Sequence, residues 1–408
     1  MHSDIHKWIA AQQDDLVKTV LELSAINSGT GNLDGLASVR DEFASLFSPL
    51  CDAQQVIQST PTERVNFLGE TLTEKYGDIL SFVKRPTAPV QVLLVGHMDT
   101  VFPSTHHFQS PTLNSGVING PGTADMKAGI LTMLTALKAF ESSQTDNTVG
   151  WRVILNADEE TGSHGSASLL ASAAEKAHVG MIYEPALPDG TLAGARKGSG
   201  NFTFVASGLS AHAGREFSKG RNAILLLAEV AQTLAGLTDI DKGITVNIAR
   251  ISGGTVFNAV PDQAVCQFNI RCETTEDQLA LATKLDEIEA KFNGREGFGL
   301  KLSGSFSRPP KVISPANSLL MNWTQECGQA LNIDLRFKAT GGCCDGNNLA
   351  AAGLPNIDTL GVLGDHIHTD KEYMVVNSFT ERASLSYLLL NKISRCSADL
   401  LSAKESAK

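Results

Sequence analysis

A histidine and a carboxylate stand two positions apart where an apolar run of the chain ends. Residues 90–96 read Val-Gln-Val-Leu-Leu-Val-Gly, and His97, Met98 and Asp99 follow. One ring nitrogen of His97 could bind a divalent metal ion, and Asp99 could accept a hydrogen bond from the other nitrogen and hold its tautomer. A His-x-Asp sequence alone fits a structural surface pair equally well. The apolar strand and glycine that precede it favour the metal site.

More carboxylates follow downstream in turn-rich segments. Asp125 comes after a Gly-Pro-Gly turn, Glu159 and Glu160 are adjacent, and Glu184 precedes a proline. Carboxylate and imidazole groups are ligands of zinc, and of two adjacent glutamates one could bind a cation while the other acts as a base toward water. Each has an ordinary alternative: Asp125 could cap a helix, and a Glu-Glu pair is usually solvated.

Two histidines near the C-terminus compete for a further ligand position. His366 and His368 lie in the segment Gly-Asp-His-Ile-His-Thr-Asp-Lys-Glu-Tyr, which starts at Gly364. A histidine in a loop is more often solvated than bound to a metal. The residues themselves leave the choice between these two open.

Strands and helices alternate in the first half of the chain, and these elements must position the polar groups. Strands are expected at 56–57, 66–68, 90–95, 151–156 and 178–183, and helices at 5–26, 36–47, 126–140 and 163–174. This alternation predicts an α/β layered sheet. Each imidazole or carboxylate follows the carboxyl end of a strand, where open α/β sheets form their sites.

The pattern changes in the middle of the chain. The order β-α-β-β-α-β is typical of a ferredoxin-like unit, and its expected elements are 201–207, 222–237, 244–251, 264–272, 276–292 and 298–306. After Arg308-Pro309-Pro310 the α/β character resumes with a helix capped by Ser314 and opened by Pro315. The sequence therefore predicts a catalytic domain in two parts, 1–197 and 309–408, interrupted by an inserted domain at 198–308.

Composition excludes several classes of partner. The net charge of −11 argues against nucleic acid and anionic membranes as partners. The N-terminus lacks a signal-peptide pattern, and no apolar run is long enough to span a membrane. Seven cysteines without a framework pattern indicate reduced thiols and a cytoplasmic protein. Cys343 and Cys344 are adjacent and form no C-x-x-C motif, so we expect small side chains in a tight loop.

Together these segments resemble the co-catalytic zinc hydrolases that include glutamate carboxypeptidase, aminoacylase, acetylornithine deacetylase and succinyl-diaminopimelate desuccinylase. The resemblance covers essentially the whole chain. Its motifs are Gly96-His-Met-Asp-Thr, Gly120-Pro-Gly-Thr-Ala-Asp-Met-Lys, Asp158-Glu-Glu-Thr-Gly, Ser210-Ala-His-Ala-Gly, Gly341-Gly-Cys-Cys-Asp-Gly-Asn and His368-Thr-Asp-Lys-Glu-Tyr. It implies an α/β fold, a phosphorylase/hydrolase-like zinc-peptidase catalytic domain with an inserted ferredoxin-like α+β domain that serves as lid and dimerisation domain.

The resemblance also implies a ligand set for two divalent metal ions, with zinc as the expected metal. His97 and Glu184 are implied to bind one ion, Glu160 and His368 the other, and Asp125 to bridge them. Cobalt and manganese accept the same ligand types.

Catalytic roles are likewise carried by the resemblance. Glu159 is implied to be the general base toward zinc-activated water, and Asp99 to orient His97. His368 is favoured over His366, because the last ligand of the family precedes a small hydroxyl residue and then Glu-Tyr.

Residues of the inserted domain are implied to bind substrate. His212 resembles the lid histidine that reaches the active site of the partner subunit, which makes a homodimer expected; otherwise it is a hairpin-turn histidine. Asn258 and Arg271 match substrate positions, although Arg271 could equally form a structural ion pair, and its guanidinium suits a substrate carboxylate. Gly341 and Gly342 suit close backbone approach to the substrate.

Two departures from the family pattern concern the substrate. Cys343-Cys344 replaces small or hydroxyl residues, and Glu184 stands where many relatives have aspartate, which favours a carboxypeptidase-like enzyme. The expected function is metal-dependent hydrolysis of a peptide or N-acyl amide bond next to a free carboxylate. An N-acyl-amino-acid deacylase is the alternative within the class, and a non-catalytic binding protein is the alternative outside it.

Overall fold

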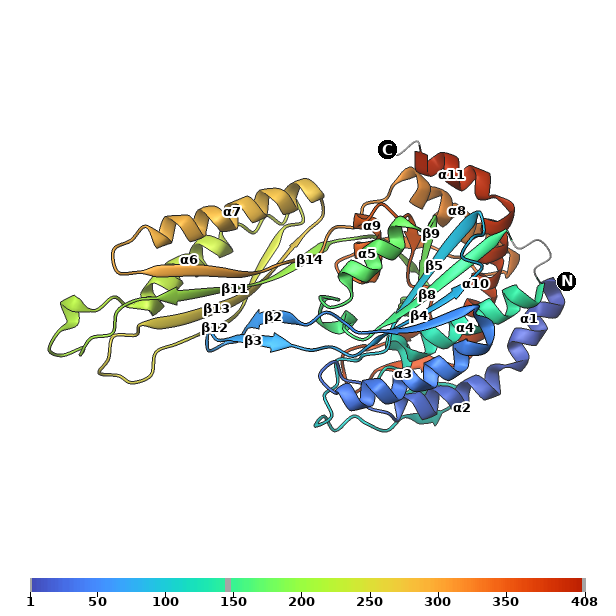
Figure 1. Cartoon of the computed structure of the whole chain (residues 1–408), viewed down its shortest axis with the longest axis horizontal. Helices are drawn as coiled ribbons and strands as arrows, with labels where there is room; N and C mark the ends of the chain where they lie inside the picture. Colours follow the sequence, from blue (N-terminus) through green and yellow to red (C-terminus); the bar gives the residue numbers. More distant parts are fainter. Residues whose placement is uncertain (1, 144–147, 406–408) are drawn as a thin grey trace.

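The computed structural model describes residues 2–143 and 148–405. Figure 1 shows an elongated molecule in which a layered α/β part, carrying both termini, continues into a narrower α+β part. Among the described residues, no helix is both long and apolar enough to cross a membrane.

The α/β part is built on a six-stranded sheet with the order β1-β4-β8-β5-β9-β16. Its strands are β1 (Ala53–Ile57), β4 (Ile79–Lys84), β5 (Val90–His97), β8 (Val149–Asn156), β9 (Val179–Ile182) and β16 (Asn356–Ile357). Strands β8, β5, β9 and β16 run parallel, and β4 and β1 are antiparallel to their neighbours. The carboxyl ends of β5, β8 and β9 therefore meet at one edge of the sheet.

Helices cover both faces of this sheet, because its central strands are apolar on both sides. Along β5, Val92 and Leu94 pack into a core with α1, α2, α3, α4, α8 and α10, while Leu93 and Val95 pack into a second core with α5 and α9. The bounds of the helices are α1 (His2–Ala11), α2 (Gln13–Ser24), α3 (Leu33–Phe47), α4 (Ala128–Ser143), α5 (Ala167–Glu175), α8 (Pro315–Ala330), α9 (Asp345–Ala351), α10 (Ser378–Arg395) and α11 (Ser397–Glu405).

Smaller sheets lie around the main one. One has the order β17-β18-β7-β6, and β10 pairs with β15 in another. Their strands are β6 (Thr112–Asn114), β7 (Val117–Asn119), β10 (Leu192–Arg196), β15 (Phe337–Thr340), β17 (Gly364–Asp365) and β18 (Tyr373–Val375), and the short helical turns are η1 (Ser48–Leu50), η2 (Thr123–Lys127) and η3 (Glu159–Thr161).

Residues 198–308, which we call the α+β unit, form an antiparallel sheet with the order β12-β13-β11-β14. Its elements are β11 (Gly198–Ser207), η4 (Phe217–Lys219), α6 (Ala223–Ala235), β12 (Thr245–Gly253), β13 (Gln263–Cys272), α7 (Thr275–Asn293) and β14 (Gly299–Arg308). Helices α6 and α7 pack on one face around their own core, which includes Phe204, Leu227 and Leu285. The α/β fold class with a ferredoxin-like strand order is therefore present, whereas the exact domain boundaries stay a prediction.

The predicted strand at 66–68 is wrong, because these residues form the turn of a hairpin. Its strands are β2 (Thr62–Val65) and β3 (Thr71–Glu74), and Asn66 closes the turn by accepting hydrogen bonds from the backbone of Leu68 and Glu70. The Ser252 hydroxyl donates to the Phe67 carbonyl at 2.6 Å. The hairpin thus connects the α/β part to the α+β unit.

Two predicted helices have other limits. The helix expected at 5–26 is two helices, α1 and α2, separated at Gln12. The helix expected to begin just after Asp125 begins at Ala128, because Asp125 and Met126 have non-helical backbone angles. The Ser314 cap is confirmed, since its hydroxyl accepts from the backbone of Asn317 at 3.1 Å.

Asp358 joins two buried cations under strand β10. Its carboxylate accepts hydrogen bonds from Arg196 at 2.8 Å and from Lys311 at 2.7 Å. All three side chains are buried. Burial alone would raise the pKa of Asp358, but Arg196 and Lys311 outweigh it and lower the pKa to about 2. Removing the carboxylate would leave two buried positive charges without their counterion.

We therefore expect Asp358→Asn to lower the free energy of unfolding at neutral pH by about 3–5 kcal/mol. Because the folded pKa of Asp358 lies below its unfolded value, this stabilisation is present above the unfolded pKa and is lost as pH falls toward about 2. Urea unfolding should show the difference from wild type narrowing below about pH 4. The control is Asp334→Asn, which removes an exposed ion pair with Arg336; equal losses in both variants would contradict the prediction.

Candidate metal centre

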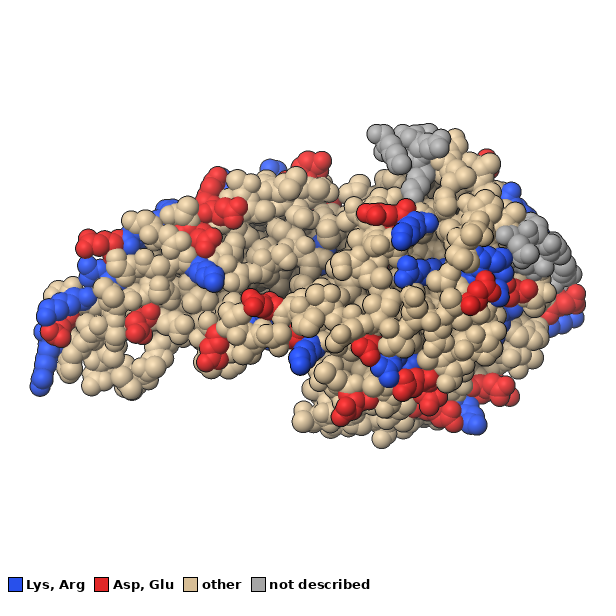
Figure 2. Space-filling view, in the orientation of Figure 1, with Lys and Arg blue, Asp and Glu red and all other residues tan. Residues whose placement is uncertain are grey.

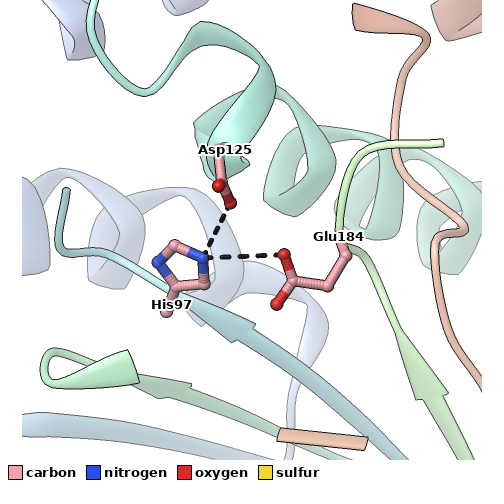
Figure 3. A group of neighbouring side chains, drawn as sticks. All are labelled: His97, Asp125 and Glu184. Carbon is pink, nitrogen blue, oxygen red and sulfur yellow. Dashed lines mark hydrogen bonds and ion pairs between the residues drawn. The ribbon is translucent and has the colours of Figure 1, made fainter. Parts of the chain in front are cut away.

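The predicted ligands converge at the carboxyl edge of the main sheet. His97 ends β5, Glu160 lies in η3 after β8, and Glu184 follows β9. Asp125 comes from the turn before α4, and His368 from the loop between β17 and β18. Figure 3 shows the side chains of His97, Asp125 and Glu184 pointing toward one another. Segments far apart in the sequence thus supply one site.

These five residues form two groups that share Asp125. In the first, His97 Nε2 lies 3.1 Å from Asp125 Oδ1 and 3.9 Å from Glu184 Oε2. In the second, His368 Nε2 lies 3.2 Å from Glu160 Oε2 and 3.4 Å from Asp125 Oδ2. Within each group the donor atoms lie within 4.8 Å of one another. Each oxygen of Asp125 therefore faces a different group, which is the geometry of a bridging carboxylate.

The charges of this cluster fit divalent cations. Burial, followed by the nearby Asp125, raises the pKa of Glu160 to about 7, and burial raises the pKa of Glu184. Hydrogen bonds to Asp125 and Glu160 raise the pKa of His368 to about 11. A buried carboxylate is costly to ionise unless a positive charge lies beside it. A divalent metal ion would supply that charge and would bind ionised oxygens and neutral imidazole nitrogens.

Asp99 contacts both His97 and the backbone of the acidic turn. The Nδ1 atom of His97 lies 3.0 Å from the backbone oxygen of Asp99 and 3.4 Å from its carboxylate. The same carboxylate accepts from the backbone N–H groups of Glu159 and Glu160, each at 3.2 Å, and from the Thr30 hydroxyl at 2.8 Å. Asp99 thereby links the turn that carries Glu159 and Glu160 to His97. The His-x-Asp spacing did not predict this contact.

Glu372 holds the turn that carries Asp125. Its buried carboxylate accepts backbone hydrogen bonds from Gly122 at 3.2 Å, Ala124 at 3.0 Å and Asp125 at 3.1 Å. Sequence reasoning assigned Glu372 no role, although it lies four residues after His368. Its position in that motif was the only available signal, because the backbone groups it binds are about 250 residues away.

Arg308 contacts the predicted general base. Its Nη2 lies 2.6 Å from Glu159 Oε1, and its Nη1 donates to Asp345 at 2.6 Å. Burial raises the pKa of Glu159 well above its usual range, and the charge of Arg308 opposes this. Sequence reasoning interpreted Arg308 only as part of a domain boundary. No local pattern marks it, because its partners come from elements distant in the chain.

Two of the predicted substrate residues lie together, and Cys343 lies beside them. Arg271 donates to the carbonyl of Gly341 at 2.5 Å and lies 4.0 Å from the sulfur of Cys343. The carbonyl of Gly342 accepts from Arg196 at 3.0 Å. Cys344 is buried and caps α9, which gives that cysteine a structural role. The alternative role expected for Arg271 was a structural ion pair, and no such pair is found among the described residues.

His212 and Asn258 lie away from this cluster within one chain. The Ala213 N–H donates to the Asn258 carbonyl at 2.9 Å, and the Gly214 N–H donates to His212 Nδ1 at 3.1 Å. Figure 1 shows the segment between β11 and α6, which contains His212, reaching the end of the α+β unit that is remote from the main sheet. Figure 2 shows Lys and Arg side chains exposed at that end. His366 also lies apart, with its ring 6.0 Å from that of Tyr373.

The fold and the two donor groups define a metal-dependent hydrolase. The chain belongs to peptidase family M20/M25/M40, whose model matches residues 93–392. It is accordingly a hydrolase of the metallopeptidase and deacylase type, and the resemblance inferred from the motifs is confirmed.

Relatives of this chain include a carboxypeptidase and a desuccinylase. It is 26% identical over 405 residues to carboxypeptidase G2 of Pseudomonas sp. (strain RS-16), covering 93% of this chain and 89% of the relative. It is 26% identical over 333 residues to succinyl-diaminopimelate desuccinylase of Nitrosococcus oceani, covering 76% and 86%.

Solved structures share the fold. A tripeptidase from Staphylococcus aureus superposes with a TM-score of 0.73 at 24% identity, covering 94% of this chain and 99% of that one. An M20 family metallo-carboxypeptidase from Sulfolobus solfataricus gives a TM-score of 0.72 at 15% identity, covering 93% and 99%.

Proposed function

We propose that the chain is a zinc-dependent carboxypeptidase-like enzyme that cleaves a peptide or N-acyl amide bond adjacent to a free carboxylate. The observation that carries this proposal is the pair of donor groups sharing Asp125, with the Glu159 carboxylate near enough to interact with the charges of His97 and Glu184. A non-catalytic binding protein would have no need to keep both donor groups and a buried base together.

Each residue of the site would have a separate role in the reaction. When bound, the metal ions polarise water and the scissile carbonyl. Glu159 accepts a proton from the attacking water and delivers it to the leaving nitrogen. Arg308 and the Asp99-bound backbone hold that carboxylate in place. His212, supplied by a partner subunit, would donate to the tetrahedral oxyanion.

Arg271 is the proposed recognition group for the substrate carboxylate. Its guanidinium is half-buried and donates to the Gly341 carbonyl, a neutral acceptor that an ionised carboxylate would replace with a stronger pair. The carboxypeptidase relative, to which 93% of this chain aligns, supports this substrate class.

The test compares substrates that differ only at the carboxylate. With metal-reconstituted protein, kcat/KM for N-acyl-glutamates and dipeptides is expected to fall about 10- to 100-fold when the carboxylate next to the scissile bond is amidated. Arg271→Met should lose most of this discrimination, whereas Arg395→Met, an exposed control, should keep it. If amidation of the substrate left kcat/KM unchanged, the proposed requirement for a free carboxylate would be wrong. If metal-loaded protein hydrolysed none of the amides, the proposal that the chain is an enzyme would be wrong.

An N-acyl-amino-acid deacylase is the second candidate, supported by the desuccinylase relatives. The same panel separates the two, because a deacylase should prefer succinyl or acetyl amides to dipeptides. Reconstitution with zinc, cobalt and manganese in parallel identifies the metal that gives turnover.

We also propose a homodimer formed through the α+β unit, in which His212 completes the site of the partner subunit. Mixing His212→Ala and Glu159→Gln subunits should restore up to about one quarter of wild-type activity, because half of the dimers are then hybrids with one intact site. Activity before and after verified subunit exchange measures this. No gain after exchange would contradict the arrangement, and Arg215→Ala subunits, altered three residues from His212, serve as the control.

A further inference from the structure

A buried arginine in α10 lacks a counterion. Arg382 is 1% exposed, and its Nη2 donates to the carbonyl of Gly190 at 3.1 Å. Its Nε and Nη1 atoms have no hydrogen-bond partner within residues 2–143 and 148–405. Its neighbour Glu381 contributes a favourable charge, yet burial dominates and lowers the pKa of Arg382 to about 10. A buried guanidinium without a counterion is strongly destabilising.

Two further buried hydroxyl groups lie on, or against, the face of α10 that carries Arg382. Ser386 lies one helical turn further along α10, on the same face as Arg382, and the Tyr183 phenol lies near the Ser386 hydroxyl. Apart from this contact with each other, neither oxygen has a hydrogen-bond partner among the described residues, and both side chains are buried.

The spacing of four residues between Arg382 and Ser386 places this shortage of partners on one face of α10. Four buried atoms with no partner outside this group belong to Arg382, Tyr183 and Ser386. All four can donate hydrogen bonds, and the group carries one positive charge. A water molecule would satisfy some of the donors but would leave the charge uncompensated. A small monovalent anion satisfies both requirements, because it only accepts hydrogen bonds and brings one negative charge.

We propose that Arg382, Tyr183 and Ser386 form an internal binding site for a small inorganic anion, with chloride as the occupant. The site is separate from the metal centre, but Tyr183 directly precedes Glu184 in the chain. The anion would tie α10 to the segment that runs from Tyr183 to Gly190. Binding of the anion would mainly stabilise this junction. The inference does not depend on the proposed substrate.

The test measures thermal unfolding of the metal-loaded protein in sodium chloride and in sodium gluconate at equal ionic strength. Chloride is expected to raise the Tm saturably, by at least about 2 °C. Arg382→Met should abolish the difference between the two salts. Arg395→Met, which alters an exposed arginine at the end of the same helix, should preserve it and so control for general salt effects.

Two further measurements locate the anion and cover a variant that fails to fold. Tyr183→Phe and Ser386→Ala each remove one donor and should shift the chloride dependence of the Tm to higher concentration. Crystals soaked in bromide should give an anomalous peak within hydrogen-bond distance of the Arg382 guanidinium. Equal Tm values in chloride and gluconate, a salt difference that persists in Arg382→Met, or water in place of bromide would each overturn the proposal.

Discussion

Glu159→Gln is expected to lower kcat by about 10²- to 10⁴-fold while leaving the metal content unchanged. Glu159 is the one carboxylate of the acidic pair that belongs to neither donor group, and its oxygen pairs with Arg308 instead. Glutamine keeps the size of the side chain and an oxygen that can accept from Arg308. It cannot take a proton from water, so the loss should fall on turnover and not on folding.

Metal analysis, the Tm and steady-state kinetics on one preparation check this prediction. Glu175→Gln, an exposed carboxylate at the end of α5, is the matched control and should behave as wild type. If Glu159→Gln retained wild-type kcat, the assignment of the base would be wrong. A parallel loss of metal would instead mean that Glu159 supports the ligands and does not act on the substrate.

Asp125→Ala is expected to remove both metal ions and to reduce activity to the limit of detection. Asp125 is the one residue common to the two donor groups among the described residues. The turn around it should persist, because Glu372 binds the backbone N–H groups of Ala124 and Asp125 and not the Asp125 side chain. The effect should therefore appear in metal content before it appears in the fold.

Single-ligand variants provide the comparison. Glu184→Ala and His368→Ala each alter one donor group and should each lose about one equivalent of metal. Asp370→Ala, an exposed aspartate two residues after His368, should lose none. Titration with a chelator and elemental analysis measure these differences. An Asp125→Ala protein that still holds two equivalents would exclude Asp125 as the bridge.

The α/β fold was predictable because its cause is local. The apolar run of β5 buries side chains on both faces, and the alternation of strands with helices leaves few ways to layer them. The incorrect secondary-structure predictions also had local causes. The apolar residues Phe67 and Leu68 suggested a strand, but an Asn66-centred turn places them at the tip of a hairpin.

Residue type and spacing at strand ends indicated the acidic and imidazole groups of the site. His97, Glu160 and Glu184 each follow a strand that the sequence predicts, so their convergence at one sheet edge could be expected from topology. The choice between His366 and His368 could not be made from these residues alone. The tertiary structure places His368 against Asp125 and Glu160, and it places His366 near Tyr373.

By itself, the sequence determined most of the central strands and helices, the family and the chemical character of the site. Only the tertiary structure decided which distant groups position it. Arg308 reaches Glu159 across 149 positions of the chain, and Glu372 reaches the Asp125 backbone across 247. Hydrophobic periodicity records which face of an element is buried, because that burial recurs at every turn or second residue. A single buried ion pair between distant segments leaves no such repeat, and it exists only once the chain has folded around it.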